Sequence, residues 1–324
     1  MDITKKLELI KRNTVEIVSE EELNELLKGN KKPVVYCGYE PSGSVHLGHF
    51  VTLSKLLDFE KAGFKVKVLL ADVHAMLNRK GDEKQIKKEA ELWKKIIKAI
   101  GLNAEIILGS SFEFEKKYQF DVMKLAQHLT IQRGLRSMQE VARDIENATI
   151  SQVWYPLMQV TDIKYLNANV ALGGMEQRKI HMLGKDSEKI LNHKFAAVHT
   201  PLISSLKGEG KMSKSIPSSS IFLDDSFETI KKTISDAYCP EKQIENNPLL
   251  QISKWIIFPR IKSMKISRLD KFGGNLEIRN YEELERIYLQ GKLHPMDLKG
   301  AIAGELEKII APIRKKIKPR TKEP

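Results

Sequence analysis

Two histidines around a glycine form the first group of residues in this chain that could bind a ligand. The run His46-Leu47-Gly48-His49 follows a short apolar segment, residues 34–38, and opens a stretch with helical spacing of apolar residues. A helix N-terminus attracts phosphate through its free backbone N–H groups and its dipole, and Gly48 would let a ligand approach the backbone closely. The pattern therefore predicts a phosphate site, although two unrelated surface histidines would read the same.

A second group of cations lies far along the chain, at Lys211-Met212-Ser213-Lys214-Ser215, after the glycine-containing stretch Gly208-Glu209-Gly210. Two lysines and two hydroxyls suit the β- and γ-phosphates of ATP, and the glycines would let the loop close over a nucleotide. Such a run alone is usually a solvated loop, but both runs in this order are rarely accidental. They predict a nucleotide site in a sequence that contains neither the GxGxxG nor the GxxxxGK[ST] fingerprint.

Short apolar segments and amphipathic helices alternate around these residues and must position them. Residues 34–38, 66–71 and 104–108 read as strands, and residues 82–100 read as a long helix between two of them. A further strand is expected at 170–173, before the helix that carries Gln177. This alternation predicts an α/β fold with a Rossmann-like, doubly wound parallel sheet, in which ligands bind at the carboxyl ends of the strands.

The pattern changes along the chain and indicates several segments. Residues 1–32 read as amphipathic helices that precede a catalytic domain at 33–223. Within that domain, residues 113–150 read as a helical insertion and 206–217 as the lysine-containing loop. The alternation of strands and helices stops near residue 224, so we expect an α-helical C-terminal domain at 224–324 that ends in a basic tail.

Net charge and cysteine content limit the classes of protein. Lys and Arg outnumber Asp and Glu by 54 to 42, which gives a formal net charge of +12. This favours a polyanionic partner through counterion release, or else a solvated lysine-rich surface. Cys37 and Cys239 are too few for a disulfide framework or a cysteine metal site. Without a secretion signal or a run of about 18 apolar residues, a cytoplasmic protein with no membrane partner is expected.

The two cationic runs are the paired HLGH and KMSKS signatures of class I aminoacyl-tRNA synthetases. Across residues 8–316 the chain resembles the archaeal-type tyrosyl-tRNA synthetases. The resemblance implies activation of tyrosine by ATP, followed by transfer of the tyrosyl group to the 3′-terminal adenosine of tRNA(Tyr). The other stretches that carry the resemblance are Tyr36–Gly43, Tyr155–Asp162, Gly173–Lys179 and His294–Asp297.

The implied activation step needs no protein nucleophile, because the amino-acid carboxylate is already ionised and attacks the α-phosphate. Alignment and positive charge must supply the catalysis. The resemblance assigns His46 and His49 to the phosphates and Lys211 and Lys214 to the pyrophosphate side, with Mg²⁺ held mostly by ATP and water. The residues expected to contact ATP otherwise are Gly38, Gly48, Gly174, Glu176, Met212 and Ser213.

The resemblance also implies an amino-acid pocket, in which the phenol of tyrosine lies between Tyr36 and Asp162. Phenylalanine would leave both side chains unpaired. Read without the resemblance, Tyr36 is a core aromatic of a strand and Asp162 a helix cap or ion-pair partner. His74 either lines this pocket or is a satisfied histidine at a strand end. The residues that resemble the binders of the substrate α-amino group are Tyr155, Gln159 and Gln177.

Contacts with tRNA follow from the same resemblance. Arg136 and Arg178 resemble readers of the first acceptor-stem base pair, although either could bind a phosphate or an acidic side chain instead. Asp297 resembles the residue that hydrogen-bonds the first anticodon base, and Phe272 resembles the aromatic residue on which that base stacks. His294 would at most assist these two residues. Read alone, Asp297 is a helix cap. The family is a homodimer through its insertion, but the apolar positions of that insertion could equally pack inside one subunit.

One departure and three alternatives remain. Many archaeal-type relatives have a neutral residue where this chain has Lys214, which leaves the division of work between Lys211 and Lys214 open. A tryptophanyl-tRNA synthetase shares the fold and signatures, but Tyr36 and Asp162 argue against it, because an indole pocket needs an acceptor for its N–H and a larger apolar slot. A nucleic-acid-binding protein without activity would not need both intact signatures. A small-molecule nucleotidyltransferase would explain neither KMSKS nor the helical C-terminal domain.

Overall fold

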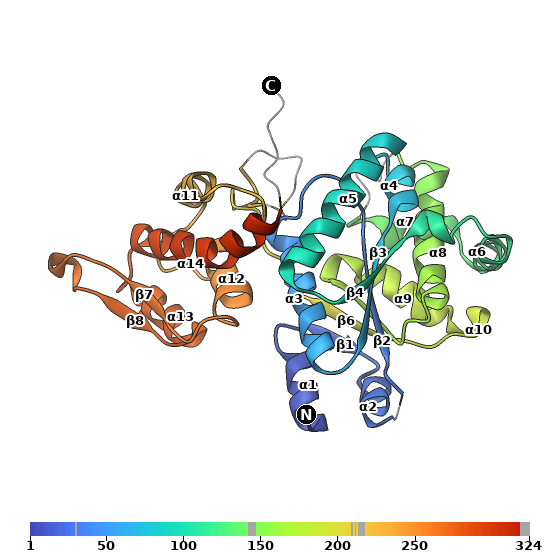
Figure 1. Ribbon diagram of the computed structural model, residues 1–324, viewed down its shortest axis with the longest axis horizontal. Coiled ribbons are helices and arrows are strands. Elements are labelled where there is room, and N and C mark those ends of the chain that lie inside the picture. The colour runs from blue at the N-terminus through green and yellow to red at the C-terminus, as the bar shows by residue number, and fades with distance from the viewer. Residues whose placement is uncertain (30, 142–146, 209, 211, 213–217, 318–324) are drawn as a thin grey trace. The chain divides into compact units, whose positions relative to one another are not determined.

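The computed structural model describes residues 1–29, 31–141, 147–208, 210, 212 and 218–317 (Figure 1). The chain forms two compact units. The first contains residues 1–43 and 52–201, and the second contains residues 44–51 and 202–324. The domain limits predicted at residues 32 and 223 stay a prediction.

A mostly parallel sheet forms the centre of the first unit. Within the described residues its strand order is β1-β6-β5-β2-β3-β4, and every neighbouring pair is parallel except β1 with β6. The strands are β1 (Glu16–Val18), β2 (Val34–Tyr39), β3 (Lys65–Leu70), β4 (Ala104–Leu108), β5 (Val170–Gly174) and β6 (Ala196–Thr200). This confirms the predicted α/β fold and the expected strands near residues 34, 66, 104 and 170.

Two of these strands were not predicted. Residues 1–32 were expected to be helical, but Glu16–Val18 forms β1, and the N–H of Val15 donates to the carbonyl of His199 at the sheet edge. A three-residue strand gives too short an apolar alternation to be recognised in a sequence. Strand β6 is buried along its whole length, so it carries no alternation of apolar and polar residues either.

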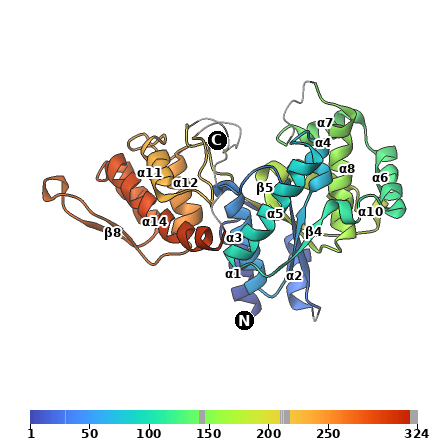
Figure 2. The ribbon, with the colours of Figure 1, turned by 45° about the horizontal axis from the view of Figure 1, so that its top comes forward.

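Helices lie on both sides of this sheet, with α5 and α8 on opposite sides of the strands (Figures 1 and 2). Helix α5 follows the prediction: Asp82 caps its first turn by accepting from the N–H of Gln85, and Gly101 ends it in the left-handed region. The helices that lie wholly or partly in this unit are α1 (Ile3–Lys11), α2 (Glu20–Lys28), α3 (Leu47–Lys61), α4 (Asp72–Leu77), α5 (Glu83–Ile100), η1 (Gly109–Ser111), α6 (Lys116–His128), α7 (Ile131–Met138), α8 (Ile150–Tyr165), η2 (Met175–Gln177), α9 (Arg178–Asp186) and α10 (Glu188–Leu191).

The second unit is mainly helical. A two-stranded antiparallel sheet interrupts the helices, and the sequence had not indicated it because each strand has only three residues. The elements are α11 (Phe227–Ser235), α12 (Pro248–Ile252), η3 (Ser253–Ile257), β7 (Met264–Ile266), η4 (Asp270–Phe272), β8 (Leu276–Ile278), α13 (Tyr281–Leu289) and α14 (Pro295–Lys316). No helix in the described ranges combines the length and apolar character needed to cross a membrane.

A buried lysine ties the N-terminal segment to helix α3. The ammonium group of Lys55 donates to the carbonyls of Leu9, Ile10 and Arg12 at the end of α1, and it lies 3.1 Å from a carboxylate oxygen of Asp58. Its side chain is almost fully buried. Because this one cation satisfies several helix-end carbonyls and a buried carboxylate, it stabilises the packing of α1 against α3.

We expect Lys55→Ala to lower the free energy of unfolding by about 3 kcal/mol, because it leaves the buried α1 carbonyls without their donor and Asp58 with Arg12 as its remaining cation. Urea denaturation followed by circular dichroism would measure the change. Lys61→Ala removes an exposed lysine from the same helix and should change stability by less than about 0.5 kcal/mol. Equal effects of the two substitutions would contradict a role for Lys55 in anchoring α1.

Candidate functional site

A cluster of buried polar side chains lies inside the first unit, where several elements meet. Tyr36 comes from β2, His74 from α4, Glu113 from the turn after η1, Tyr118 from α6 and Asp162 from α8. Each has an exposed fraction of 1% or less. Charged groups are rarely buried this completely unless they are paired or have a function, so this cluster is the strongest candidate site in the unit.

The strand order explains how these residues come together. His74 and Glu113 follow the carboxyl ends of β3 and β4, which are neighbours in the sheet. Tyr36 lies on β2, the strand on the other side of β3, and β2 pairs in turn with β5. The cluster thus lies at the sheet edge where ligands bind in doubly wound folds.

Asp162 has one satisfied and one unsatisfied carboxylate oxygen. The hydroxyl of Tyr118 donates to Oδ1 at 2.7 Å and also lies 3.0 Å from the carbonyl of Met158. Oδ2 lies 3.6 Å from Nε2 of His74 and accepts no hydrogen bond from the described part of the chain. Burial, together with the charge of Glu113, raises the pKa of Asp162 well above its usual value. A hydroxyl donor placed at Oδ2 would relieve this cost.

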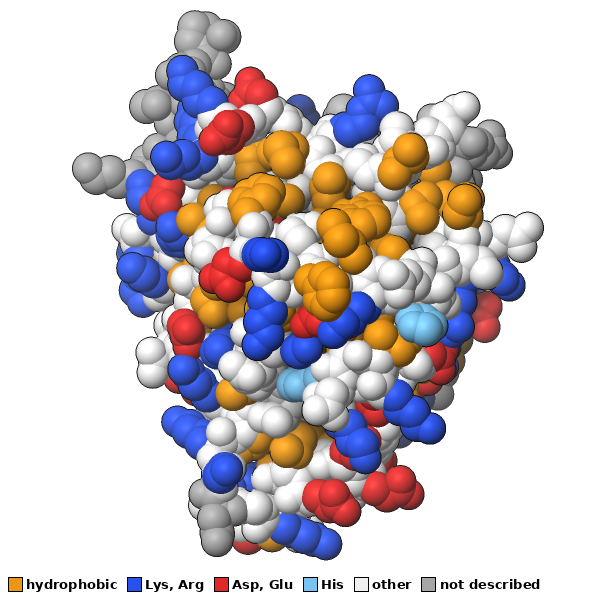
Figure 3. All heavy atoms as spheres, turned by 90° about the vertical axis from the view of Figure 1, so that its right-hand side faces the viewer, with side chains coloured by type: hydrophobic (Ala, Val, Ile, Leu, Met, Phe, Trp, Pro, Cys, Tyr) orange, Lys and Arg blue, Asp and Glu red, His pale blue; other side chains and the backbone are white. Residues whose placement is uncertain are grey.

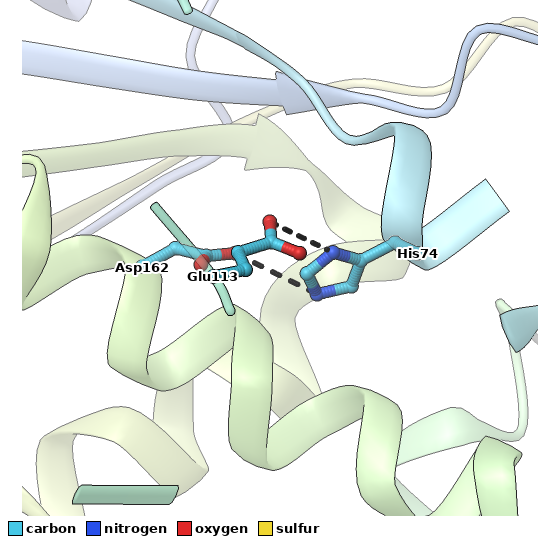
Figure 4. A group of neighbouring side chains, drawn as sticks. All are labelled: His74, Glu113 and Asp162. Atoms are coloured by element: carbon cyan, nitrogen blue, oxygen red, sulfur yellow. Dashed lines mark ion pairs between the residues drawn. The ribbon is translucent and has the colours of Figure 1, made fainter. Parts of the chain in front are cut away.

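His74 lies between two carboxylates (Figure 4). Its Nδ1 is 3.5 Å from Glu113 and its Nε2 is 3.6 Å from Asp162, while its ring packs edge-on against Tyr155 at a centroid distance of 4.5 Å. Burial lowers the pKa of His74, but the two carboxylates outweigh burial and raise the pKa to about 9. The two carboxylates thus favour the protonated form of His74.

These three residues also have the composition of a metal site, since one ligand atom from each lies within 4.8 Å of the others. Zinc sites combine imidazole and carboxylate ligands in this way. A metal ion bound to all three residues would have to lie beside one nitrogen of His74, with both carboxylates on that same side of the ring. Instead, Nδ1 faces Glu113 and Nε2 faces Asp162. The arrangement fits an imidazolium cation between two anions better than it fits a metal ion.

The residues expected at the substrate α-amino group also lie in this unit. Nε2 of Gln159 donates to Oε1 of Gln177 at 3.0 Å, and Tyr155 is buried. Gly173 and Gly174 leave room for the next turn, because a Cβ on Gly173 would lie 2.7 Å from the Cβ of Gln177. Gly38, on β2, lies over the ring of Tyr36. The structure thus brings several of the predicted substrate residues together, and their roles stay predictions.

The HLGH residues belong to the second unit. The ring of His46 stacks on that of His49 at a centroid distance of 3.7 Å, and Nδ1 of His49 accepts from the N–H of His46. A Cβ on Gly48 would lie 2.9 Å from the His46 ring and 4.0 Å from the Cβ of Met212. Met212 belongs to the KMSKS run, so the two signatures are neighbours there. Lys211, Ser213 and Lys214 lie outside the described residues.

Two arginines were predicted to contact nucleic acid. Arg178 pairs through Nε and Nη2 with the carboxylate of Glu16, at 2.7 and 2.8 Å. This agrees with the alternative that Arg178 binds an acidic side chain. Arg136 is exposed on α7.

In the second unit, the side chain of Phe272 is 58% exposed, and the ammonium group of Lys271 lies over its ring. His294, not Asp297, caps α14, because its Nδ1 accepts from the N–H of Met296. Asp297 lies in the first turn of that helix, so the interpretation of Asp297 as the cap is wrong.

Sequence reasoning missed Glu113 and Tyr118, although they surround Asp162. Both were assigned to the insertion at 113–150 and were not considered for the pocket. A usable signal existed, because Glu113 follows the strand at 104–108 just as His74 follows the preceding strand. No signal in the sequence indicates Tyr118, since only the packing of α6 on α8 turns its hydroxyl towards Asp162.

The chain is similar to known proteins along most of its length. The family model described as tRNA synthetases class I (W and Y) matches residues 28–311. The tyrosine–tRNA ligase of Methanocaldococcus jannaschii is 48% identical over 96% of this chain and 99% of that protein. The corresponding enzyme of Methanopyrus kandleri is 44% identical over 98% and 99%. The structure of the Archaeoglobus fulgidus tyrosyl-tRNA synthetase with L-tyrosine is similar, with a TM-score of 0.93, 44% identity and coverage of 98% and 100%.

We expect Tyr118→Phe to lower the free energy of unfolding by about 1–3 kcal/mol, because it leaves a buried oxygen of Asp162 without a donor. The hydrogen bond stabilises the ionised form of Asp162, so the loss should be larger at pH 8 than at pH 5. Urea denaturation at the two pH values measures it. Tyr165→Phe, which removes a hydroxyl from the half-buried pair with Asp121, is the control. A loss that does not depend on pH would contradict this account.

Proposed function

The chain belongs to the class I tRNA synthetases for tryptophan and tyrosine, and we propose that it acts as a tyrosine–tRNA ligase. Tyrosine reacts with ATP to give tyrosyl-adenylate and pyrophosphate, and the tyrosyl group is then transferred to the 3′-terminal adenosine of tRNA(Tyr). One structural observation supports tyrosine above all: Asp162 carries a buried oxygen that lacks a hydrogen-bond donor among the described residues. The hydroxyl of a substrate phenol would supply that donor.

Tyrosine fits this pocket better than tryptophan does. A phenol hydroxyl both donates and accepts, so it can donate to Asp162 and accept from Tyr36. The N–H of an indole only donates and would leave the buried hydroxyl of Tyr36 without a partner. Phenylalanine would leave both groups unsatisfied, at a cost of about 1–3 kcal/mol for each. The α-amino group would bind Tyr155, Gln159 and Gln177.

Adenylate formation would rely on positioning and positive charge. The carboxylate of tyrosine attacks the α-phosphate of ATP, and the bond between the α-phosphorus and the leaving pyrophosphate breaks. His46 and His49 would bind the phosphates, and Lys211 and Lys214 the pyrophosphate side, with Mg²⁺ arriving as part of the ATP substrate. The position of Gly48 supports this, because a Cβ at residue 48 would lie 4.0 Å from the Cβ of Met212, which belongs to the KMSKS run. Glycine at position 48 leaves the His46 ring in place, and Gly174 and Glu176 would hold the ribose.

Transfer to tRNA would use cationic and aromatic groups of both units. The net charge of +12 favours binding of a polyanion. Arg136 and Arg178 would contact the acceptor stem, which requires Arg178 to leave Glu16. The exposed ring of Phe272 is suited to stacking on an anticodon base, with Asp297 as the hydrogen-bonding acceptor and His294 next to it. A translation enzyme of this kind would act in the cytoplasm.

A homodimer would form through the predicted insertion. Helix α6 has two faces: Tyr118, Val122 and Leu125 point into the core, whereas Phe120 and Met123 are more than half exposed. Apolar side chains gather on this side of the unit (Figure 3), and large exposed apolar patches mark interaction sites. Among the described residues of the segment and its flanks, the large exposed apolar side chains are Phe114, Phe120, Met123, Ile131 and Ile150.

Pyrophosphate exchange into ATP, run with each amino acid in turn, tests the proposed substrate. We expect exchange with tyrosine, and an Asp162→Asn variant should lose about 30-fold in kcat/KM for tyrosine, which corresponds to about 2 kcal/mol. Its activity with phenylalanine should change little. Asp121→Asn alters another buried carboxylate, on α6, and serves as the control. An unchanged preference for tyrosine in Asp162→Asn, or exchange with tryptophan instead, would refute the assignment.

Sedimentation velocity tests the dimer. Phe120→Glu places a charge in the exposed apolar patch, so we expect it to shift the chain from dimer to monomer without loss of helical circular dichroism. Phe272→Glu makes the same change at an exposed aromatic of the second unit and should leave the dimer intact. A Phe120→Glu variant that sediments like the unaltered protein would exclude this surface as the interface.

A further inference from the structure

We propose that Glu113 is a positioning residue for tyrosine selection, which holds the His74 imidazole between itself and Asp162 and whose own negative charge opposes ionisation of the Asp162 carboxylate. The proposal rests on the proposed tyrosine–tRNA ligase activity and deepens it. It assigns a function to a carboxylate that the sequence did not single out.

The geometry places His74 as a bridge. Its two ring nitrogens face two carboxylates from different elements, Glu113 at 3.5 Å and Asp162 at 3.6 Å (Figure 4). All three side chains are at least 99% buried. Neither carboxylate oxygen of Glu113 has a hydrogen-bond partner in the described part of the chain. A buried carboxylate is retained only when a cation compensates it, and His74 is the cation that Glu113 faces.

The chain is built to hold Glu113 in this position. The backbone N–H of Glu113 donates to the carbonyl of Gly109, and the side-chain amide of Gln119 donates to the backbone carbonyl of Glu113. The carboxylate then lies directly over Gly109, where a Cβ would be only 2.2 Å from Oε1. Glycine at 109 therefore provides the space that lets Glu113 reach His74. Such fixed backbone and side-chain geometry is typical of residues that position a ligand-binding group.

The groups around His74 explain the direction of the effect. Glu113, from the turn after η1, and Asp162, from α8, face the two ring nitrogens, and the ring of Tyr155 packs edge-on against the imidazole. Glu40, after β2, adds a weaker electrostatic effect. Tyr118 donates to Asp162 from α6. Two carboxylates and one imidazolium leave a net charge of −1 when Asp162 is ionised. Removal of Glu113 would make ionisation of Asp162 easier, whereas removal of His74 would make it harder.

These opposite signs give a test based on the pH dependence of kcat/KM for tyrosine in pyrophosphate exchange. Glu113→Gln should move the acidic limb of the profile to lower pH by about one unit, a tenfold change in rate on that limb. His74→Gln should move the same limb to higher pH. Phenylalanine, which offers no hydroxyl to Asp162, should show neither shift. Glu115→Gln, at an exposed position two residues further along, is the control and should leave the limb unchanged.

Imidazole NMR provides a second readout that does not need activity. The resonance of His74, assigned by its loss in His74→Gln, should titrate near pH 9 in the unaltered chain and at lower pH in Glu113→Gln. The proposal would be overturned if His74 titrated at the same pH in the unaltered chain and in Glu113→Gln. It would also be overturned if Glu113→Gln and His74→Gln moved the acidic limb in the same direction. Inhibition by Zn²⁺ that tyrosine reverses would overturn the proposal and indicate instead that His74, Glu113 and Asp162 bind a metal ion. Absence of tyrosine exchange would refute the proposed function, while the NMR titration would still decide the link between Glu113 and His74.

Discussion

The cost of burying two carboxylates determines much of the structure around the candidate pocket. Asp162 and Glu113 are both inaccessible to water, and a buried charge is tolerated only when donors and cations replace the lost hydration. Tyr118 and His74 provide them, from α6 and α4. Four separate segments must therefore meet at one point, and a parallel sheet brings them there because the loops after its strands share one edge.

Much of this could be predicted from the sequence, and the exceptions have a physical reason. Strands β2 to β5 were recognised from their apolar runs and helix α5 from its long helical periodicity, and Gly101 marks the end of α5. The fully buried strand β6 was missed. Strand β1 and the pair β7–β8 were missed because three residues are too few for a pattern. The motifs at His46 and Lys211 were found from local residue types. Tyr118 was not, since its relation to Asp162 arises only from the packing of two helices.

The HLGH run and the buried cluster around Asp162 belong to different compact units of the chain. Helix α3 begins beside His46 in one unit and continues to Lys61 in the other. In the second unit, Gly48 and Met212 make the two signatures neighbours although they are distant in sequence.

The contact between Gly109 and Glu113 has a consequence for how this protein can change. Any side chain at position 109 would overlap the carboxylate of Glu113, with its Cβ 2.2 Å from an oxygen. A substitution at 109 therefore requires the Glu113 carboxylate to turn away from its place beside His74, so the effects of changes at the two positions are not additive. A shorter residue at 113 would remove this overlap.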